Sequence, residues 1–330
     1  MRRRHPEHEK GAALLTVLLL VAVIAVIAGT ALERLRLSTR LGGNAIAGEQ
    51  ARAYAEAAEA LAVMRVSDLL GQDNTRVTLA GGWSGRPFGL PLPGGGTAVA
   101  RVTDGGNCFN LNGLVSEAGP GTYVTYPSAR IEFARLMRLL QIPAQAADHI
   151  AAAAADWIDS DQDQQASGAE DGTYLTKAIS YRTSGSLMSD PSELRAVDGM
   201  TPGYYTALRP WVCTRPKAEL SRINVNTLTP EQAPLVAMLY PDTLSVGAAQ
   251  AILVRRPPDG YPSVATFLNG ASASGITLDR VAERQLAVTT NWFALRIDVA
   301  FGAMQLQEHA LIDASRLPAR LVSRQWGEQT

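Results

Sequence analysis

The sequence predicts an α+β protein in which a long N-terminal helix packs on a small antiparallel sheet, with a large all-α domain inserted between the strands. Three observations predict this fold. An uncharged apolar run near the N-terminus leads into a helix-forming segment. Segments prone to form strands lie before residue 113 and after residue 285, whereas the residues between them favour helices. The chain has 330 residues with 46% hydrophobic and 18% charged content, which is typical of a globular protein of two or three domains.

The apolar run at residues 12–32 is predicted to cross a membrane once. It contains no charged residue in 21 positions, enough for a helix to span a hydrocarbon core about 30 Å thick. The leader, residues 1–11, carries four basic residues: Arg2, Arg3, Arg4 and Lys10. Because basic residues stay on the cytoplasmic side, we expect a cytoplasmic N-terminus, a single inner-membrane span and a periplasmic remainder. The run is too long for a cleaved signal peptide, whereas an uncut signal anchor remains an alternative.

The helix is predicted to continue beyond the membrane to Leu69. It would then hold 58 residues from Ala12 and be about 85 Å long at 1.5 Å per residue. Gly42 and Gly43 are a weak point at which the helix can bend. The outer half carries a stripe of apolar or small residues at helical spacing, which needs a sheet to cover it: Ala47, Ala51, Tyr54, Ala58, Leu61 and Met64.

The strands of the sheet are predicted on both sides of the insertion. Residues 33–112 hold the outer helix and two short strand-forming runs, Thr75–Leu79 and Thr97–Val102. Residues 286–330 return to strands. Here five apolar residues alternate with smaller or polar ones, and residues 304–314 can pair back after a turn at Gly302-Ala303; the five are Phe293, Leu295, Ile297, Val299 and Phe301.

The insertion is predicted to contain two helical units, residues 113–222 and residues 223–285. In the first, Ser128 is expected to cap a helix over residues 129–142, and an alanine-rich helix covers residues 144–158. The second resembles a helix-hairpin-helix or SAM-like unit and begins with a capping box at Thr229–Gln232. Each unit follows an N-x-N pattern, Asn110-Leu-Asn112 and Asn224-Val-Asn226, an echo that chance can also produce.

The two cysteines, Cys108 and Cys213, lie near the two ends of the first helical unit. An oxidising periplasm permits a disulfide between them. A bridge there would close a loop of about 100 residues and contribute up to ~4–5 kcal/mol in the chain-entropy model. Two unrelated buried thiols are the alternative.

An acidic loop is predicted to bind Ca²⁺. It gathers five carboxylates within 13 residues: Asp159, Asp161, Asp163, Glu170 and Asp171. With Asp159 at position 1, the first four occupy positions 1, 3, 5 and 12 of an EF-hand loop, although position 6 is Gln164 instead of glycine. The absence of a nearby histidine or cysteine disfavours Zn²⁺, and many unconstrained oxygens favour Ca²⁺ over Mg²⁺. A solvated acidic loop without an ion remains an alternative, and a catalytic carboxylate pair is less favoured.

Several motifs together resemble one family. The order of basic leader, Lys10-Gly11 and apolar run is similar to a type IV prepilin leader. D-W-I-D-S-D at residues 156–161, G-A-E-D at 168–171 and I-N-V-N-T at 223–227 resemble the minor pseudopilins of type II secretion, K subtype (general secretion pathway protein K). Most pilins carry glutamate at the fifth mature residue, where this sequence has Thr16. The K subtype resembles this sequence in lacking that glutamate.

The resemblance implies a pilin-like fold and a role without enzymatic activity. Prepilin peptidase would cut between Gly11 and Ala12, and Ala12 would be methylated. The protein would cap a periplasmic pseudopilus with the minor pseudopilins I and J above the major pseudopilin. Together they would nucleate the fibre that exports folded proteins across the outer membrane. Calcium in the insertion is a further implication.

Two other functions are weighed against this one. A membrane-anchored DNA receptor can also carry a helix-hairpin-helix, but residues 240–247 lack the Gly-x-Gly turn that grips phosphate. Arg255 and Arg256 alone give too little charge, and the net charge of −1 gives no bulk attraction to nucleic acid. An anchored hydrolase is disfavoured because no G-x-S-x-G, H-E-x-x-H or Cys-His arrangement occurs in the sequence.

Overall fold

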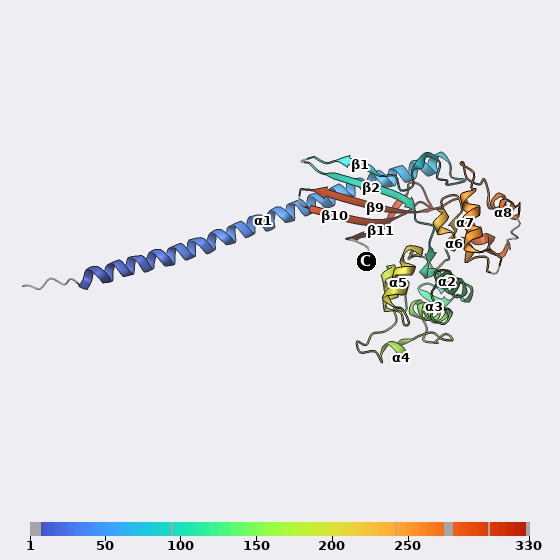
Figure 1. Ribbon diagram of the computed structural model, residues 1–330, viewed down its shortest axis with the longest axis horizontal. Helices are drawn as coiled ribbons and strands as arrows, with labels where there is room; N and C mark the ends of the chain where they lie inside the picture. The colour runs from blue at the N-terminus through green and yellow to red at the C-terminus, as the bar shows by residue number, and fades with distance from the viewer. Residues whose placement is uncertain (1–7, 94, 242, 274–279, 303, 328–330) are drawn as a thin grey trace, which may run out of the picture.

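The computed structural model describes residues 8–93, 95–241, 243–273, 280–302 and 304–327. Leader residues 1–7 and the predicted turn residue Ala303 lie outside these ranges. A single helix, α1 (His8–Gln72), passes through Gly42 and Gly43 without interruption. Its first half projects alone, and every side chain from residue 12 to residue 46 is exposed (Figure 1).

The outer half of α1 packs on a five-stranded antiparallel sheet with the order β1-β2-β9-β10-β11. The strands before the insertion pair directly with those after it, so that Val102 lies opposite Leu295. The predicted α+β class with a split sheet is therefore confirmed. The strands are β1 (Phe88–Pro91), β2 (Thr97–Asp104), β9 (Trp292–Phe301), β10 (Met304–Asp313) and β11 (Arg320–Trp326).

The predicted strand at Thr75–Leu79 is wrong. The segment is irregular because turn and side-chain bonds occupy its backbone groups. Asp73 accepts from the Thr75 amide at 2.9 Å, and the Thr78 carbonyl accepts from Trp83 Nε1 at 2.7 Å. A single bond from the Val77 amide to the Val288 carbonyl, 2.8 Å, is too little to build a ladder.

Small side chains let α1 approach the sheet closely. The buried face of the helix is mostly alanine, and it meets the apolar face of β9; the helix residues are Ala51, Ala55, Ala58, Ala62, Val66 and Leu70. This i, i+4 spacing explains why the predicted member Met64 is wrong: it lies off the covered face and is 59% exposed. The stripe that we predicted is otherwise buried or half-buried.

A charge cluster with two buried carboxylates joins α1 to the edge strand β11. Arg324 donates two hydrogen bonds to the Glu59 carboxylate, and its Nε lies 3.7 Å from Oε1 of the fully buried Glu308. Burial, together with the neighbouring Glu59, raises the pKa of Glu308 to about 9. Burial also acts to raise the pKa of Glu59, but its hydrogen bonds and ion pair with Arg324 help to outweigh burial and lower the pKa. Glu308 is therefore the neutral partner.

We expect Glu308→Gln to change how stability depends on pH. Between the unfolded pKa near 4.5 and the folded pKa of about 9, the native state holds a proton that the unfolded state has lost. Stability from this site is therefore complete at low pH and falls as pH rises. The free energy of unfolding of the variant minus that of the parent should be roughly 1–3 kcal/mol larger at pH 9 than at pH 5. Urea unfolding at both values measures this, and parallel pH profiles for the two proteins would contradict it.

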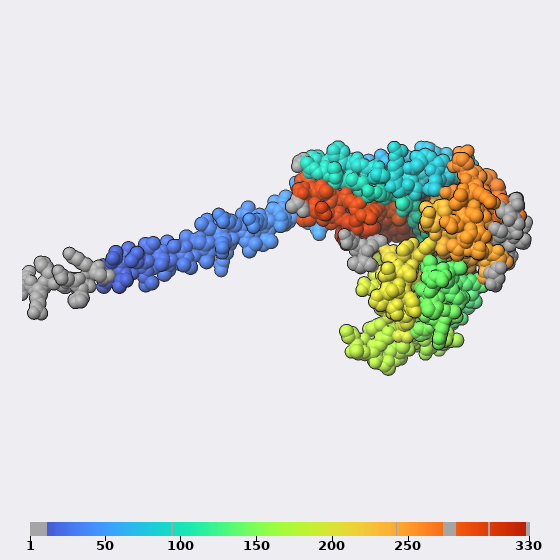
Figure 2. Space-filling view, in the orientation of Figure 1, coloured from blue at the N-terminus to red at the C-terminus, as the bar shows by residue number. Residues whose placement is uncertain are grey.

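The insertion contains two helical units around one continuous core (Figures 1 and 2). The predicted cap at Ser128 is wrong, because Pro127 opens the helix and Tyr126 takes the N-cap position. The capping box at Thr229 is confirmed. The helices are α2 (Pro127–Leu139), α3 (Ala144–Ile158), α4 (Asp171–Tyr174), α5 (Pro202–Leu208), α6 (Pro234–Ala237), α7 (Val246–Val254) and α8 (Val264–Ala273).

Short pairings and single 3₁₀ turns complete the insertion. The pairings are β3 (Phe109–Asn110) with β6 (Val212–Cys213), β4 (Val115–Gly119) with β5 (Thr122–Thr125), and β7 (Ile223–Asn224) with β8 (Leu286–Ala287). The 3₁₀ segments here are η2 (Leu111–Leu114), η3 (Pro191–Ala196), η4 (Arg209–Trp211), η5 (Pro230–Gln232) and η6 (Arg280–Gln285), whereas η1 (Ala80–Gly82) lies before β1 in the pilin part of the chain.

The two N-x-N motifs adopt the same local structure. In each, the side chain of the first asparagine accepts from the backbone amide of the second, at 3.3 Å for Asn110 and 3.0 Å for Asn224. The second asparagine then pairs in both directions with one distant backbone: Asn112 with Met188 and Asn226 with Tyr261. All four asparagines are fully buried. The repeated pattern in the sequence therefore corresponds to the same local structure at the start of each helical unit.

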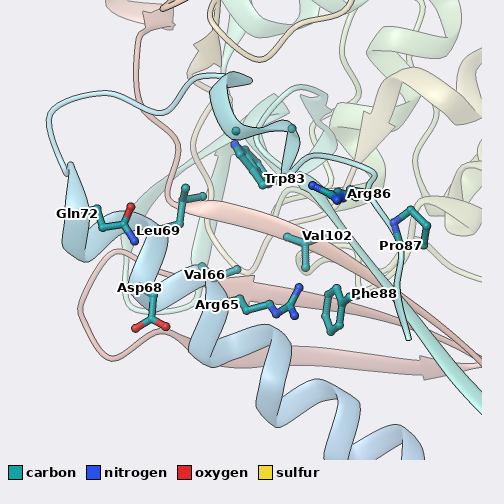
Figure 3. A pocket seen from close by; sticks show the side chains of 12 residues that line it. Arg65, Val66, Asp68, Leu69, Gln72, Trp83, Arg86, Pro87, Phe88 and Val102 are labelled. Carbon is teal, nitrogen blue, oxygen red and sulfur yellow. The ribbon is translucent and has the colours of Figure 1, made fainter. Parts of the chain in front are cut away.

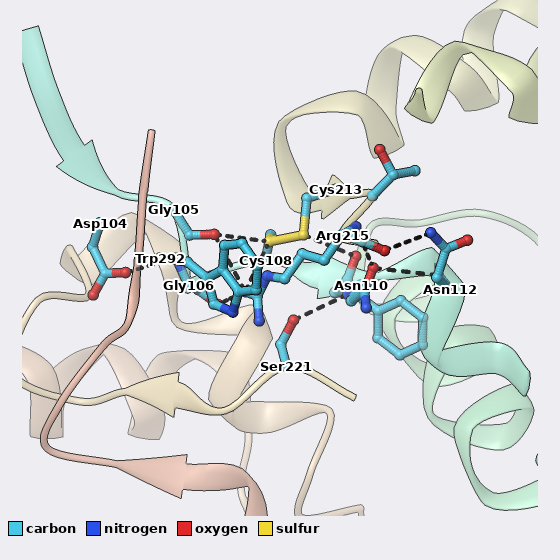
Figure 4. Close-up of a disulfide and its surroundings, with 12 residues drawn as sticks. Asp104, Gly105, Gly106, Cys108, Asn110, Asn112, Cys213, Arg215, Ser221 and Trp292 are labelled. Atoms are coloured by element: carbon cyan, nitrogen blue, oxygen red, sulfur yellow. Dashed lines mark hydrogen bonds between the residues drawn. A yellow bond between two sulfur atoms is a disulfide. The ribbon is translucent and has the colours of Figure 1, made fainter. Parts of the chain in front are cut away.

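A disulfide pins the first helical unit to the sheet. Cys108 and Cys213 are bonded across a separation of 105 residues (Figure 4), which confirms the predicted pair. The buried Arg215 lies beside the bridge and donates to the carbonyls of Gly105 at 3.2 Å and Gly106 at 2.7 Å. Its guanidinium also stands over the Trp292 ring, 5.6 Å from the centroid. The junction between sheet and insertion is thus held by covalent, polar and aromatic contacts together.

Candidate metal centre

Three acidic side chains converge inside the first helical unit. Asp156 and Asp159 lie at the end of α3, and Glu170 directly precedes α4. Each offers an oxygen atom, and these atoms all lie within 4.8 Å of one another. The three residues are only 0%, 2% and 5% exposed, respectively. Carboxylates so deeply buried need protons, donors or a cation to compensate their charge.

The protein holds two of these side chains in place but leaves oxygens free. Asp156 accepts from the backbone amides of Gln165 and Ala169, the latter at 2.8 Å, and Asp159 Oδ2 accepts from Thr125 Oγ1 at 2.8 Å. The remaining Asp159 oxygen and both Glu170 oxygens are buried and have no hydrogen-bond partner among the described residues. Unpartnered oxygens that point together are the feature that a hard cation satisfies.

The electrostatics also favour a cation at this position. Burial raises the pKa of Asp156 and that of Asp159 to about 6. Burial raises the pKa of Glu170 further, to about 8, because the charges of Asp156 and Asp159 add to its effect. A bound divalent cation would oppose all three shifts by favouring the ionised forms. The donor set consists of oxygens alone, so it suits Ca²⁺ or Mg²⁺ better than Zn²⁺.

The acidic loop packs closely against Asp156 and is also held by His149. A side chain at position 168 would place its Cβ 2.0 Å from Asp156 Oδ2, so only glycine fits there. His149 Nδ1 lies 2.6 Å from the Ser167 carbonyl, and His149 Nε2 lies 2.9 Å from Asp198. The packing of the loop on α3 therefore fixes the positions of the carboxylates.

The structure brings two of the five predicted carboxylates together. Asp159 and Glu170 belong to the buried cluster, whereas Asp161 and Asp163 are exposed on the loop. Asp161 caps the Asp163 amide at 2.8 Å. Asp171 instead pairs with Arg182 and accepts from the Thr183 amide at 2.9 Å.

Asp156 is the member that sequence reasoning missed. It lies three residues before Asp159 on the same helix, and this i, i+3 spacing was the available signal. Its place inside an alanine-rich helix made it look like part of a helix face instead of a loop ligand.

The described residues contain one helix long and apolar enough to cross a membrane, and it lies near the N-terminus. That helix continues as the support of an antiparallel sheet, and the sheet carries a helical insertion with a buried acidic centre. These features together define the class: a pilin-like protein whose N-terminal helix fits a single-pass membrane anchor and whose sheet carries a helical insertion.

Comparisons with known proteins identify the family. Two family models, both described as type II secretion system (T2SS) protein K, match residues 107–217 and 223–289. Type II secretion system protein K of Pectobacterium carotovorum is 32% identical over 97% of each chain, and that of Klebsiella pneumoniae is 33% identical over the same shares. The chain therefore belongs to the type II secretion system protein K family and is a minor pseudopilin of that system.

A solved structure agrees with this assignment. The chain resembles one in the crystal structure of the GspK-GspI-GspJ complex from the enterotoxigenic Escherichia coli type 2 secretion system, with a TM-score of 0.73 and 31% identity. The match covers 85% of this chain and 97% of that one.

Proposed function

We propose that this minor pseudopilin caps the periplasmic pseudopilus and nucleates it together with the minor pseudopilins I and J, for export of folded proteins across the outer membrane. The observation that carries the proposal is the likeness to a chain solved as part of a GspK-GspI-GspJ complex. The shape of the molecule supports the same position. The second helical unit lies at the outer end of α1 (Figures 1 and 2), where a subunit stacked further out would need to place its own helix.

In this proposal the chain is anchored once in the inner membrane, with its N-terminus in the cytoplasm and its head in the periplasm. Prepilin peptidase cuts between Gly11 and Ala12, and the major pseudopilin assembles beneath the tip. The role is structural and not enzymatic. Nucleic acid is not a partner in this proposal, because Arg256, one of the two arginines that a DNA receptor would use, is half-buried and donates to the carbonyls of Val225 and Leu228 at 3.1 and 2.6 Å.

We propose Ca²⁺ as the ion of the acidic centre. Asp156, Asp159 and Glu170 would hold it, and the bound ion would neutralise their buried charge and fasten the loop to α3. Asp161, Asp163 and Asp171 remain in the proposal as sources of further negative charge. The charges of Asp161 and Asp171 already raise the pKa of Glu170, and that of Asp163 raises the pKa of Asp159.

Co-purification tests the tip assignment. Full-length protein carrying a C-terminal tag, expressed with its own minor pseudopilins, should retain the I and J subunits after detergent extraction, and its sequenced N-terminus should be Ala12. A chromosomal deletion should stop export while leaving exoproteins folded in the periplasm. A protein that keeps Met1 in the membrane, binds neither subunit and leaves export unchanged on deletion would contradict the assignment.

A further inference from the structure

A surface pocket opens between the last turns of α1 and the loop that leads into β1. Its volume is about 560 Å³, which exceeds the size of any one side chain. Six of its lining residues have apolar side chains: Val66, Leu69, Trp83, Pro87, Phe88 and Val102 (Figure 3). We call it the Trp83 pocket. It lies on the pilin part of the molecule and shares no residue with the acidic centre or the disulfide junction.

The walls of the Trp83 pocket are fixed before anything binds. Trp83 Nε1 donates to the Thr78 carbonyl at 2.7 Å, and the indole packs against Phe293 with the ring centroids 5.6 Å apart. Gly81 and Gly82 take left-handed conformations, with φ of 76° and 63°, which other residues adopt only with strain. These contacts hold the indole at the pocket wall, against the sheet residue Phe293.

Two arginines give the apolar pocket a positive rim. The Arg65 guanidinium lies 4.0 Å from the centre of the Phe88 ring, and Arg86 lines the wall beyond it. Neither has a carboxylate within ion-pair distance in the described part of the chain. Asp68 is the one acidic lining residue, and Figure 3 shows its carboxylate directed away from Trp83 and Val102. The pocket therefore offers apolar area and two unneutralised cations side by side.

We propose that the Trp83 pocket binds a segment of a partner protein in which a carboxylate side chain stands next to a large apolar side chain. The apolar side chain fills the space between Trp83 and Phe88, where aromatic anchors contribute strongly to binding. The carboxylate pairs with Arg65 and Arg86, whose planar guanidinium groups suit that geometry. The inference uses only the pocket and does not depend on the tip position of the chain.

The position of the pocket argues for a protein partner. Arg65 lies 33 residues along α1 from the end of the apolar run at Leu32, which is about 50 Å at 1.5 Å per residue. A lipid headgroup at the membrane surface cannot reach that far. Nucleic acid is disfavoured because two cations give weak phosphate binding at physiological salt.

A charge-swap experiment on full-length protein in detergent micelles tests the proposal. The probe is the blocked peptide acetyl-Gly-Ser-Glu-Phe-Ser-Gly-amide, with versions that carry Gln or Lys in place of Glu, titrated by calorimetry. We expect the Glu peptide to bind at least tenfold more tightly than the Gln peptide. Arg65→Glu combined with Arg86→Glu should reverse the preference toward the Lys peptide. Arg316→Glu, an exposed arginine on the loop before β11, should leave it unchanged.

Each other outcome overturns the proposal. Equal affinity for the three peptides, or no binding up to millimolar concentration, shows that the pocket does not read charge beside an apolar group. A preference that survives the double charge reversal places binding elsewhere. If a peptide ending in a free Phe carboxylate binds more tightly than the internal Glu-Phe sequence, the pocket recognises a chain terminus. Thermal unfolding of the double variant within about 2 °C of the parent, near what a neutral surface change produces, verifies that it is folded.

Discussion

Replacing Glu170 with alanine is expected to abolish the stabilisation that Ca²⁺ gives this protein. An ion that binds only the native state stabilises by mass action, by about 4 kcal/mol at a concentration 1,000 times its dissociation constant. Glu170 brings two buried oxygens without partners to the centre, so its loss removes ligands that the exposed loop carboxylates do not replace. Chemical denaturation of the full-length protein with Ca²⁺ and with chelator measures the difference.

The controls separate the buried cluster from loop charge in general. Asp148→Ala, at an exposed carboxylate that pairs with Arg138 on the surface, should keep the full Ca²⁺ response. Asp161→Ala with Asp163→Ala should keep most of it. Glu170→Gln should be more stable than the parent in chelator at pH 8, because it relieves the repulsion of Glu170 by Asp156 and Asp159. A Ca²⁺ response that persists in Glu170→Ala would place the ligands elsewhere.

Removing the disulfide is expected to cost about as much as losing the ion. Cys108→Ser with Cys213→Ser releases a constraint on a loop of 105 residues, worth up to about 4.7 kcal/mol in the chain-entropy model. Arg215 should not compensate, because its contacts need the junction to be closed. Urea unfolding of the full-length protein with and without reductant measures the loss. Reductant should destabilise the parent and leave the double variant unchanged, whereas a double variant within about 1 kcal/mol of the oxidised parent would contradict the prediction.

Long periodic patterns were enough to predict most of the fold. The alternation from Phe293 to Phe301 and the outer half of α1 depend on burial along one face, which the order of residues records directly. Short segments failed because individual hydrogen bonds decide them. Asp73 and Trp83, which are near in sequence, and Val288, which is distant, bind the backbone of Thr75–Leu79 in an irregular conformation. Met64 failed because the width of the covered face depends on where the sheet ends.

The acidic centre was predicted in part for a similar reason. Alternating carboxylates led us to an EF-hand spacing, but Gln164 stands where such a loop needs glycine for its sharp turn. The backbone therefore carries Asp161 and Asp163 outward, and Asp156 from the preceding helix takes their place. The spacing of the carboxylates identified the loop, whereas the packing of the loop on α3 determines which carboxylates converge.

The split of the sheet determines the order in which the molecule can mature. The apolar stripe of α1 is synthesised first, yet the strand that covers its centre, Trp292–Phe301, comes more than 200 residues later. At roughly 5–20 residues per second of synthesis, that interval lasts about 10–40 s. During this interval, β9 is not yet available to cover the apolar stripe of α1. The cover of the helix is therefore completed only after the whole insertion has been synthesised.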